Sequence, residues 1–227
     1  MKTLSIIIPV YNEEKTLRSI IEKVKSVHLP LVKQIILVDD GSIDGSAAIA
    51  RSISGIDLFL HDKNQGKGAA IQTGIRNATG DVIVIQDADL EYDPDDIIKL
   101  ISPIIAGTHD VVYGSRFTRK ENHNWAIPSH YIGNRLISCI INLLFGSELH
   151  DIETGYKAFT KKAADVLRLT LNDFGFEVEF TVQMIQNNLR IIEVPISYRS
   201  RKWDEGKKIT WKDGVKAIYY ILKFKLQ

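Results

Sequence analysis

The chain has 227 residues, with 29 Lys and Arg against 28 Asp and Glu. This length suits one large domain with a real core, and a single cysteine excludes an intramolecular disulfide framework, so we expect Cys139 to be packed in the interior. Met1 leads into a short strand without a signal peptide, and the longest apolar stretch, Leu136–Phe145, falls short of the ~20 residues of a spanning helix, so we expect no membrane crossing.

Apolar, β-branched runs alternate with segments of helical periodicity along most of the chain. The predicted strands are Leu4–Val10, Ile35–Val38, Ile56–Leu60, Val82–Ile85, Asp110–Tyr113, Tyr156–Thr160 and Ile191–Tyr198. The predicted helices are one capped by Asn12, Ser46–Ile53, Gly66–Ala78, one starting at Asp93, Asn134–Phe145, Lys161–Leu169, Phe176–Asn187 and Thr210–Phe224. This order indicates an α/β fold with a doubly wound, mostly parallel sheet and helices on both faces.

Two of these helices have an unusual composition. Asn134–Phe145 is apolar almost all round except for a stripe of Arg135, Ser138 and Asn142. Thr210–Phe224 is amphipathic, with an apolar face of Trp211, Val215, Ile218 and Leu222. It lies in a basic C-terminal region, since the last thirty residues hold nine Lys and Arg against three Asp and Glu. Such a combination suits an anionic surface, and a solvated face is the alternative. The polar stretch Arg116–Ser129 is expected to be a mobile loop.

The most informative stretch is Gly80–Asp96, which has seven carboxylates and no Lys or Arg. Two like charges ~4 Å apart repel by roughly 4 kcal/mol at an effective dielectric of ~20, so a tight cluster needs a cation. Asp93 and Pro94 read as a helix start, which leaves the carboxylates of Asp87, Asp89 and Glu91. Asp87 and Asp89 follow a buried strand at spacing i, i+2, and such hard ligands suit Mg²⁺ or Mn²⁺ that carries phosphates. An acidic loop at a strand end is the alternative.

Two other polar clusters follow strands. Asp39 and Asp40 are either loop acids or hydrogen-bond acceptors for a base or ribose. The segment Asn64–Gly68 lacks the glycine spacing of a phosphate loop, so it is either a tight turn that caps a helix or a contact to a nucleotide through Lys67. The six histidines show no metal-ligand spacing. Because ligands of such sheets bind beyond the carboxyl ends of the strands, three polar clusters are expected to converge on one edge: Tyr11–Glu13, Asp39 with Asp40, and Asp87–Asp89.

Nine segments together resemble family 2 inverting glycosyltransferases of the GT-A fold, and most closely the branch that acts on polyprenyl phosphates. The segments are IIIPVYNEE (Ile6–Glu14), VDDGSIDGS (Val38–Ser46), NQGKGAA (Asn64–Ala70), GDVIVIQDADLEYDP (Gly80–Pro94), YGSRF (Tyr113–Phe117), DIETGYKAF (Asp151–Phe159), GFEVEF (Gly175–Phe180), EVPISY (Glu193–Tyr198) and EGKKI (Glu205–Ile209). The resemblance implies an enzyme that moves a hexose from a nucleotide-diphosphate sugar to a polyprenyl phosphate, with Mg²⁺ or Mn²⁺.

The resemblance also implies roles for individual residues. The nucleotide sugar would be held by Pro9, Tyr11, Glu13, Asp39, Asp40, Lys67, Asp87 and Ala88. The metal ligands would be Asp87, Asp89 and Glu91, the last at a position where relatives often have Gln. Arg116 and Arg135 would face the acceptor phosphate, and Arg199, Arg201, Lys207 and Lys208 would lie on a loop over the diphosphate. A hydroxyl acceptor would require a general base, for which Glu153 and Asp151 are the candidates.

The expected organisation is a glycosyltransferase domain over 1–198, with a nucleotide-sugar half (1–115) and an acceptor half (116–198), followed by the basic loop and helix of 199–227. The expected partners are the sugar donor, the polyprenyl phosphate and a membrane surface, without nucleic acid, and with a homo-oligomer or a separate membrane subunit left open. The expected location is cytoplasmic, on the inner face of a membrane. A transferase for saccharide hydroxyls and a catalytically silent sugar-nucleotide-binding subunit are the alternatives.

Overall fold

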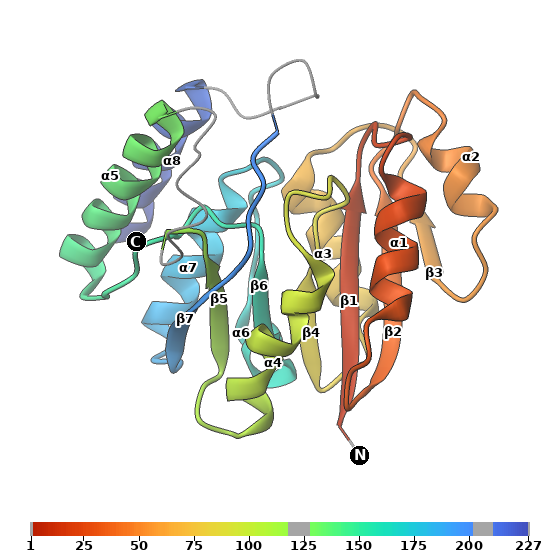
Figure 1. The fold of residues 1–227 in the computed structure, drawn as a ribbon. Coiled ribbons are helices and arrows are strands. Elements are labelled where there is room, and N and C mark those ends of the chain that lie inside the picture. Colours follow the sequence, from red (N-terminus) through yellow and green to blue (C-terminus); the bar gives the residue numbers. More distant parts are fainter. Residues whose placement is uncertain (1, 118–127, 202–210, 227) are drawn as a thin grey trace.

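Seven strands form one sheet in the computed structural model, which describes residues 2–117, 128–201 and 211–226 (Figure 1). The strands are β1 (Thr3–Val10), β2 (Val32–Asp39), β3 (Asp57–Leu60), β4 (Val82–Ile85), β5 (Val111–Ser115), β6 (Lys157–Thr160) and β7 (Ile191–Pro195). Their order across the sheet is β3-β2-β1-β4-β6-β5-β7. All neighbouring pairs are parallel except the two made by β6, which runs antiparallel between β4 and β5. The predicted mostly parallel α/β sheet is confirmed.

Helices cover both faces of this sheet. They are α1 (Leu17–Ser26), α2 (Ser46–Arg51), α3 (Lys67–Asn77), the 3₁₀ helix η1 (Pro94–Asp96), α4 (Ile97–Ile105), α5 (Pro128–Phe145), α6 (Lys161–Val166), α7 (Phe176–Gln186) and α8 (Trp211–Lys225). One apolar cluster joins alternate residues of β1 and β4 to α1 and α4, and a second joins the intervening residues to α3 and α7. The central strands are therefore buried on both faces, as their unbroken apolar runs predict.

The chain after β1 differs from the prediction, because α1 begins at Leu17 and its N-cap is Thr16 rather than Asn12. Asn12 has φ +54° and accepts a hydrogen bond from the backbone N of Ile43 at its Oδ1. The predicted Asn12 cap is thus wrong, since its side chain ties the β1 end to the loop after β2. The helix start at Asp93 is confirmed, because its Oδ1 accepts a bond from the backbone N of Asp95.

The apolar helix α5 packs against α8 and α7, and Ser138 and Asn142 of its polar stripe face inward, whereas Arg135 is exposed. The Asn142 side chain donates to the backbone carbonyl of Leu149 and accepts from the backbone N of the same residue. The Ser138 hydroxyl accepts a bond from the backbone N of Ile152. These contacts turn the opposite, apolar side of the helix outward. Cys139 lies on that side and is exposed, so the prediction of a buried cysteine is wrong.

Helix α8 has both buried and exposed apolar residues. Ala217 and Ile221 are buried, whereas Val215 and Leu222 of the predicted apolar face are 58% and 50% exposed. The helix therefore has apolar residues on a buried and on an exposed side. No helix in the described part of the chain is long and apolar enough to span a bilayer. Most of the predicted mobile loop, residues 118–127, lies outside the described residues.

Candidate active site

The carboxyl ends of β1 and β4 are joined by one guanidinium group. Arg201 Nη1 lies 3.1 Å from Glu13 Oε2, and Nη2 lies 2.9 Å from Asp89 Oδ2. Arg201 belongs to the segment after β7, which Figure 1 shows rising to the edge of the sheet where β1 and β4 end. Glu13 and Asp89, which belong to two of the clusters predicted to converge, are therefore joined by a cation of the C-terminal segment.

Asp87 has a cationic partner of its own, Lys67. The Lys67 Nζ is 2.8 Å from Asp87 Oδ1, and the two side chains are 17% and 16% exposed. Lys67 is the first residue of α3, and the preceding Gly66 is the N-cap with φ +104°. A Cβ on Gly66 would lie 2.3 Å from the carbonyl O of Asn172, so this turn requires glycine. The predicted turn at the start of a helix is therefore confirmed, and it directs Lys67 to the acidic pair of Asp87 and Asp89. The nucleotide contact through Lys67 stays a prediction.

The buried carboxyl of Asp89 does not ionise as readily as a carboxyl in water. Burial raises the pKa of Asp89 to about 7, the charges of Asp87 and Glu91 add to this, and Arg201 opposes it. Burial also acts to lower the pKa of Lys67, but the charges of Asp87 and Glu177 outweigh it, so the pKa is raised. The site is therefore well suited to accept a further cation between the carboxylates.

The donor groups fit a metal that is shared with a substrate rather than a closed protein cage. No three His, Cys, Asp or Glu side chains in the described ranges converge as a ligand set. Mg²⁺ is commonly held by one or two carboxylates together with substrate phosphates, and Asp87 and Asp89 supply that number. Glu91 instead accepts bonds from the Tyr198 hydroxyl at 2.9 Å and from the backbone N of Arg201 at 2.8 Å. These contacts favour an anchoring role for Glu91 toward residues 198–201.

The two acids after β2 have different surroundings. Asp39 Oδ1 accepts a bond from the backbone N of Ser42, while its Oδ2 is buried without a partner among the described residues. Asp40 accepts bonds from the backbone N of Gln65 and Gly66 and lies 2.7 Å from His61 Nδ1. Asp39 is thus the acid with an unused acceptor for a ligand N–H, whereas Asp40 holds the turn before α3. The other predicted donor contacts, Pro9, Tyr11 and Ala88, lie at the ends of β1 and β4.

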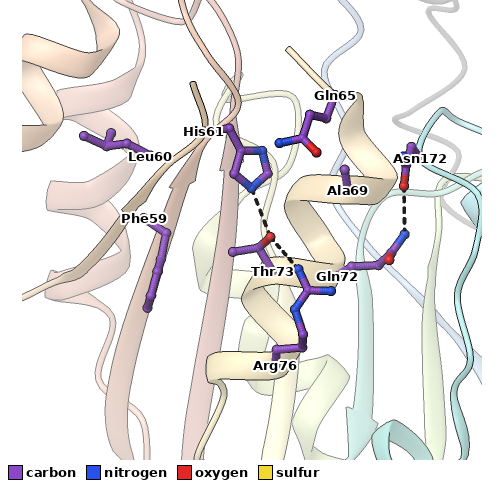
Figure 2. Close-up of a pocket in the computed structure, with 9 residues that line it drawn as sticks. All are labelled: Phe59, Leu60, His61, Gln65, Ala69, Gln72, Thr73, Arg76 and Asn172. Atoms are coloured by element: carbon purple, nitrogen blue, oxygen red, sulfur yellow. Dashed lines mark hydrogen bonds between the residues drawn. The ribbon is translucent and has the colours of Figure 1, made fainter. Parts of the chain in front are cut away.

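A cavity of about 440 Å³ lies beside this turn, between β3 and α3 (Figure 2). Its lining includes Phe59, Gln65, Gln72 and Arg76, and none of its residues belongs to the acidic pair. Within it, His61 bridges Asp40 and the Thr73 hydroxyl, which is 3.0 Å from Nε2. Arg76 also donates to the Thr73 hydroxyl, and Gln72 donates to Asn172, so most polar groups of the lining bind one another and we assign the cavity no function.

Of the two arginines predicted to face an acceptor, Arg116 contacts Tyr198, which in turn binds Glu91. Arg116 binds the buried Asp151 through Nε at 2.9 Å and Nη2 at 2.6 Å, and its guanidinium stacks over the Tyr198 ring. Arg135 is exposed on α5, and no contact within the described ranges joins it to the cluster. Arg199 donates its backbone N to Glu91 O and has an exposed side chain. Lys207 and Lys208 lie outside the described residues.

Three buried charged groups underlie this site, and only one was expected from the sequence. Glu153, the predicted base candidate, has a buried Oε1 without a partner in the described structure. Burial raises its pKa to about 7, and the charge of Glu177 adds to this. Lys157 and Glu177, which were not predicted, form a buried ion pair. A lysine within the apolar run Tyr156–Phe159 was the available signal, because a charge in a buried strand needs a partner.

Comparison with known proteins identifies the family. The model of "Glycosyl transferase family 2" matches residues 5–168, most of the chain. The chain belongs to glycosyl transferase family 2. It is 31% identical to the UDP-N-acetylglucosamine–dolichyl-phosphate N-acetylglucosaminyltransferase of Methanococcus voltae, over 99% of this chain and 97% of that protein. It is 29% identical to the polyprenol monophosphomannose synthase of Mycolicibacterium smegmatis, over 89% of this chain and 79% of that protein.

Solved structures agree on the fold of this family 2 glycosyltransferase. Glucosyl-3-phosphoglycerate synthase of Mycobacterium tuberculosis, crystallised with Mn²⁺, UDP and phosphoglyceric acid, superposes with a TM-score of 0.77 at 20% identity. The match covers 99% of this chain and 78% of the synthase. The predicted GT-A type of fold is therefore confirmed, and the family match confirms the predicted glycosyltransferase activity.

Proposed function

We propose that this glycosyltransferase moves a hexose, with inversion, from a nucleotide-diphosphate sugar to a polyprenyl phosphate and uses Mg²⁺ or Mn²⁺. The observation that carries the proposal is the acidic pair Asp87 and Asp89 at the carboxyl edge of the sheet, with Lys67 and Arg201 directly beside it. The names of the two relatives support the acceptor class, since both contain a polyprenyl-type phosphate or product. They differ in the sugar, so the sugar stays unassigned.

The charge of each residue indicates which part of the donor or metal it would bind. The unused Asp39 Oδ2 would accept a ring N–H of the base, and both uracil and guanine offer one. A metal bound by Asp87 and Asp89 would supply electrophilic stabilisation of the leaving diphosphate. Lys67 and Arg201 would shift from the carboxylates to the diphosphate oxygens and stabilise the charge that develops there. A phosphate acceptor is already anionic at neutral pH, so the reaction requires no strong base.

The direct test is transfer of labelled sugar from UDP- and GDP-linked donors to a short polyprenyl phosphate with Mn²⁺. We expect label in the lipid fraction for one donor class, and a matching rise in melting temperature with UDP or GDP. A soluble saccharide serves as the competing acceptor. Label in the saccharide but not in the lipid would contradict the acceptor assignment.

A hydroxyl acceptor is a second candidate because Glu153 has the properties of a general base. Its Oε1 is buried and unpartnered among the described residues, and its pKa is raised to about 7. A carboxyl with this pKa is protonated below pH ~7 and accepts a proton only above it. Water is the simplest hydroxyl acceptor, so donor hydrolysis reports on this role.

We expect slow donor hydrolysis to increase with pH up to about 7 and then level off, because the Glu153 carboxylate forms over that range. Glu153→Gln should lower the hydrolysis rate by about 10²-fold and flatten the pH profile, while transfer to lipid phosphate changes little. The matched control is Glu148→Gln, an exposed acid in the same loop. An unchanged pH profile in Glu153→Gln would remove the base role.

We further propose that the exposed apolar stripes of α5 and α8 lie on a membrane surface, where a polyprenyl phosphate would be found. Ile132, Leu136 and Leu143 of α5 are 65%, 51% and 83% exposed, and Val215, Tyr219 and Leu222 of α8 are 58%, 63% and 50% exposed. Each stripe follows helical spacing, and the two helices pack together. Lys216, Lys223 and Lys225 of α8 are exposed, and each basic residue near an anionic leaflet contributes ~1 kcal/mol.

We expect the protein to sediment with anionic liposomes but not with neutral ones, and to be released by high salt. Leu136→Asp with Leu222→Asp should abolish binding, because both charges would enter the lipid interface. Val32→Asp with Ile98→Asp is the control, since these apolar residues are exposed on β2 and α4. Arg135→Ala should impair lipid transfer and spare donor hydrolysis. Absence of binding to anionic liposomes at low salt, or dimerisation through these stripes, would contradict the membrane role.

A further inference from the structure

The ion pair beneath the site begins with a lysine that has no exposure to solvent. Lys157 lies in β6 and is 0% exposed. Its Nζ donates to the backbone carbonyls of Ile152 and Thr154, the former at 3.0 Å, and to the carboxylate of Glu177. One ammonium group therefore ties the loop before β6 to helix α7.

Glu177 has a second cation on its other side. Its Oε1 is 3.8 Å from Lys67 Nζ, while Oε2 binds Lys157. Lys67 in turn binds Asp87 and lies over the Phe176 ring at 5.9 Å. Alternating charges thus run from Lys157 through Glu177 and Lys67 to Asp87, from the protein interior to the acidic pair.

A stabilising role alone does not account for this buried ion pair. Replacing a buried ion pair by apolar residues of similar volume is often neutral or stabilising, because burying charges is costly. The contact between Glu177 and Lys67 suggests a role in the site itself. If Asp87 binds a metal ion instead of Lys67, Glu177 still supplies the Lys67 ammonium with a negative partner. The ammonium group then stays beside the acidic pair.

We propose that Glu177 and Lys157 are positioning residues: Glu177 fixes Lys67 for the diphosphate of the donor, and Lys157 fixes Glu177. This inference rests on the proposed function only in its assignment of a nucleotide-diphosphate donor. In this proposal neither residue touches the substrate, and both act through Lys67. Removing either residue should therefore weaken diphosphate binding only while Lys67 is present.

The test is a double-mutant cycle read by calorimetric titration of UDP and of GDP with Mn²⁺. Glu177→Gln removes the charge and keeps the shape, and should weaken diphosphate binding about tenfold in an otherwise native chain. In a Lys67→Met background, the same change should alter affinity by less than about twofold. Lys157→Met should repeat this pattern. Equal losses in both backgrounds, or native affinity in folded Glu177→Gln, would overturn the proposal.

A matched ion pair separates positioning from stability. Asp110 and Arg190 are 2.9 Å apart at the opposite edge of the sheet, where β5 begins. Asp110→Asn with Arg190→Met should lower the melting temperature and leave nucleotide affinity unchanged. If it weakens binding as much as Glu177→Gln does, the effect is general destabilisation and the proposal fails. The titrations contain no acceptor, so a wrong acceptor assignment does not affect their outcome.

Discussion

Asp89→Asn is expected to reduce glycosyl transfer by about 10³-fold, because a metal that stabilises a leaving diphosphate contributes several kcal/mol. Asparagine keeps the shape of Asp89 but cannot supply the negative charge that binds a cation. Calorimetric titration with Mn²⁺ in the presence of UDP or GDP should show the matching loss of metal affinity. Excess EDTA should abolish transfer by the native protein.

The fold of Asp89→Asn should be at least as stable as the native one at neutral pH. A carboxyl whose pKa is raised in the folded state costs stability above its unfolded pKa, and burial raises the pKa of Asp89 to about 7. Arg201 keeps Glu13 as a partner when Asp89 is replaced. Asp95→Asn is the control, because this exposed acid lies in the same acidic stretch. Full transfer in excess EDTA would contradict the metal role.

The sheet and its functional edge were predictable because they depend on local patterns. Unbroken β-branched runs such as Val82–Ile85 form strands buried on both faces, and that requires helices on both sides. Once the strands are parallel, their carboxyl ends share an edge, so Asp39, Asp87 and Glu13 had to lie along it. The order of the elements placed these residues without any knowledge of side-chain contacts.

Long-range pairings were not predictable. Arg201 meets Asp89 across 112 residues of sequence, and no local pattern specifies which of several C-terminal cations does so. The same holds for Lys157, whose partner Glu177 is on another element. The wrong predictions have the same origin. Asn12 has the composition of a helix cap but is bound by the loop after β2, and Cys139 is exposed because the polar side of α5 has partners inside.

Gly155→Ala is the second change with a large expected effect, because this glycine is packed against the acidic pair itself. A Cβ at this position would lie 2.3 Å from Asp87 Oδ2 and 2.8 Å from Lys67 Nζ. Both atoms would have to move, and a misplacement of ~1 Å can cost about 10²-fold in rate. We therefore expect Gly155→Ala to lose about 10²-fold in donor hydrolysis and in lipid transfer alike, while the circular dichroism spectrum is unchanged.

Gly133→Ala on α5 is the matched control, since no atom lies within 4 Å of its added Cβ. Alanine is favoured over glycine within a helix by up to about 1 kcal/mol, so this variant should melt at a slightly higher temperature with native activity. The contrast separates a loss of backbone freedom from a collision with Asp87 and Lys67. Because Gly155 precedes β6 and Asp87 follows β4, the collision also tests how closely the loop before β6 must approach the end of β4. Native activity in Gly155→Ala would mean that the acidic pair tolerates displacement, and that Asp87 does not act from the position it occupies here.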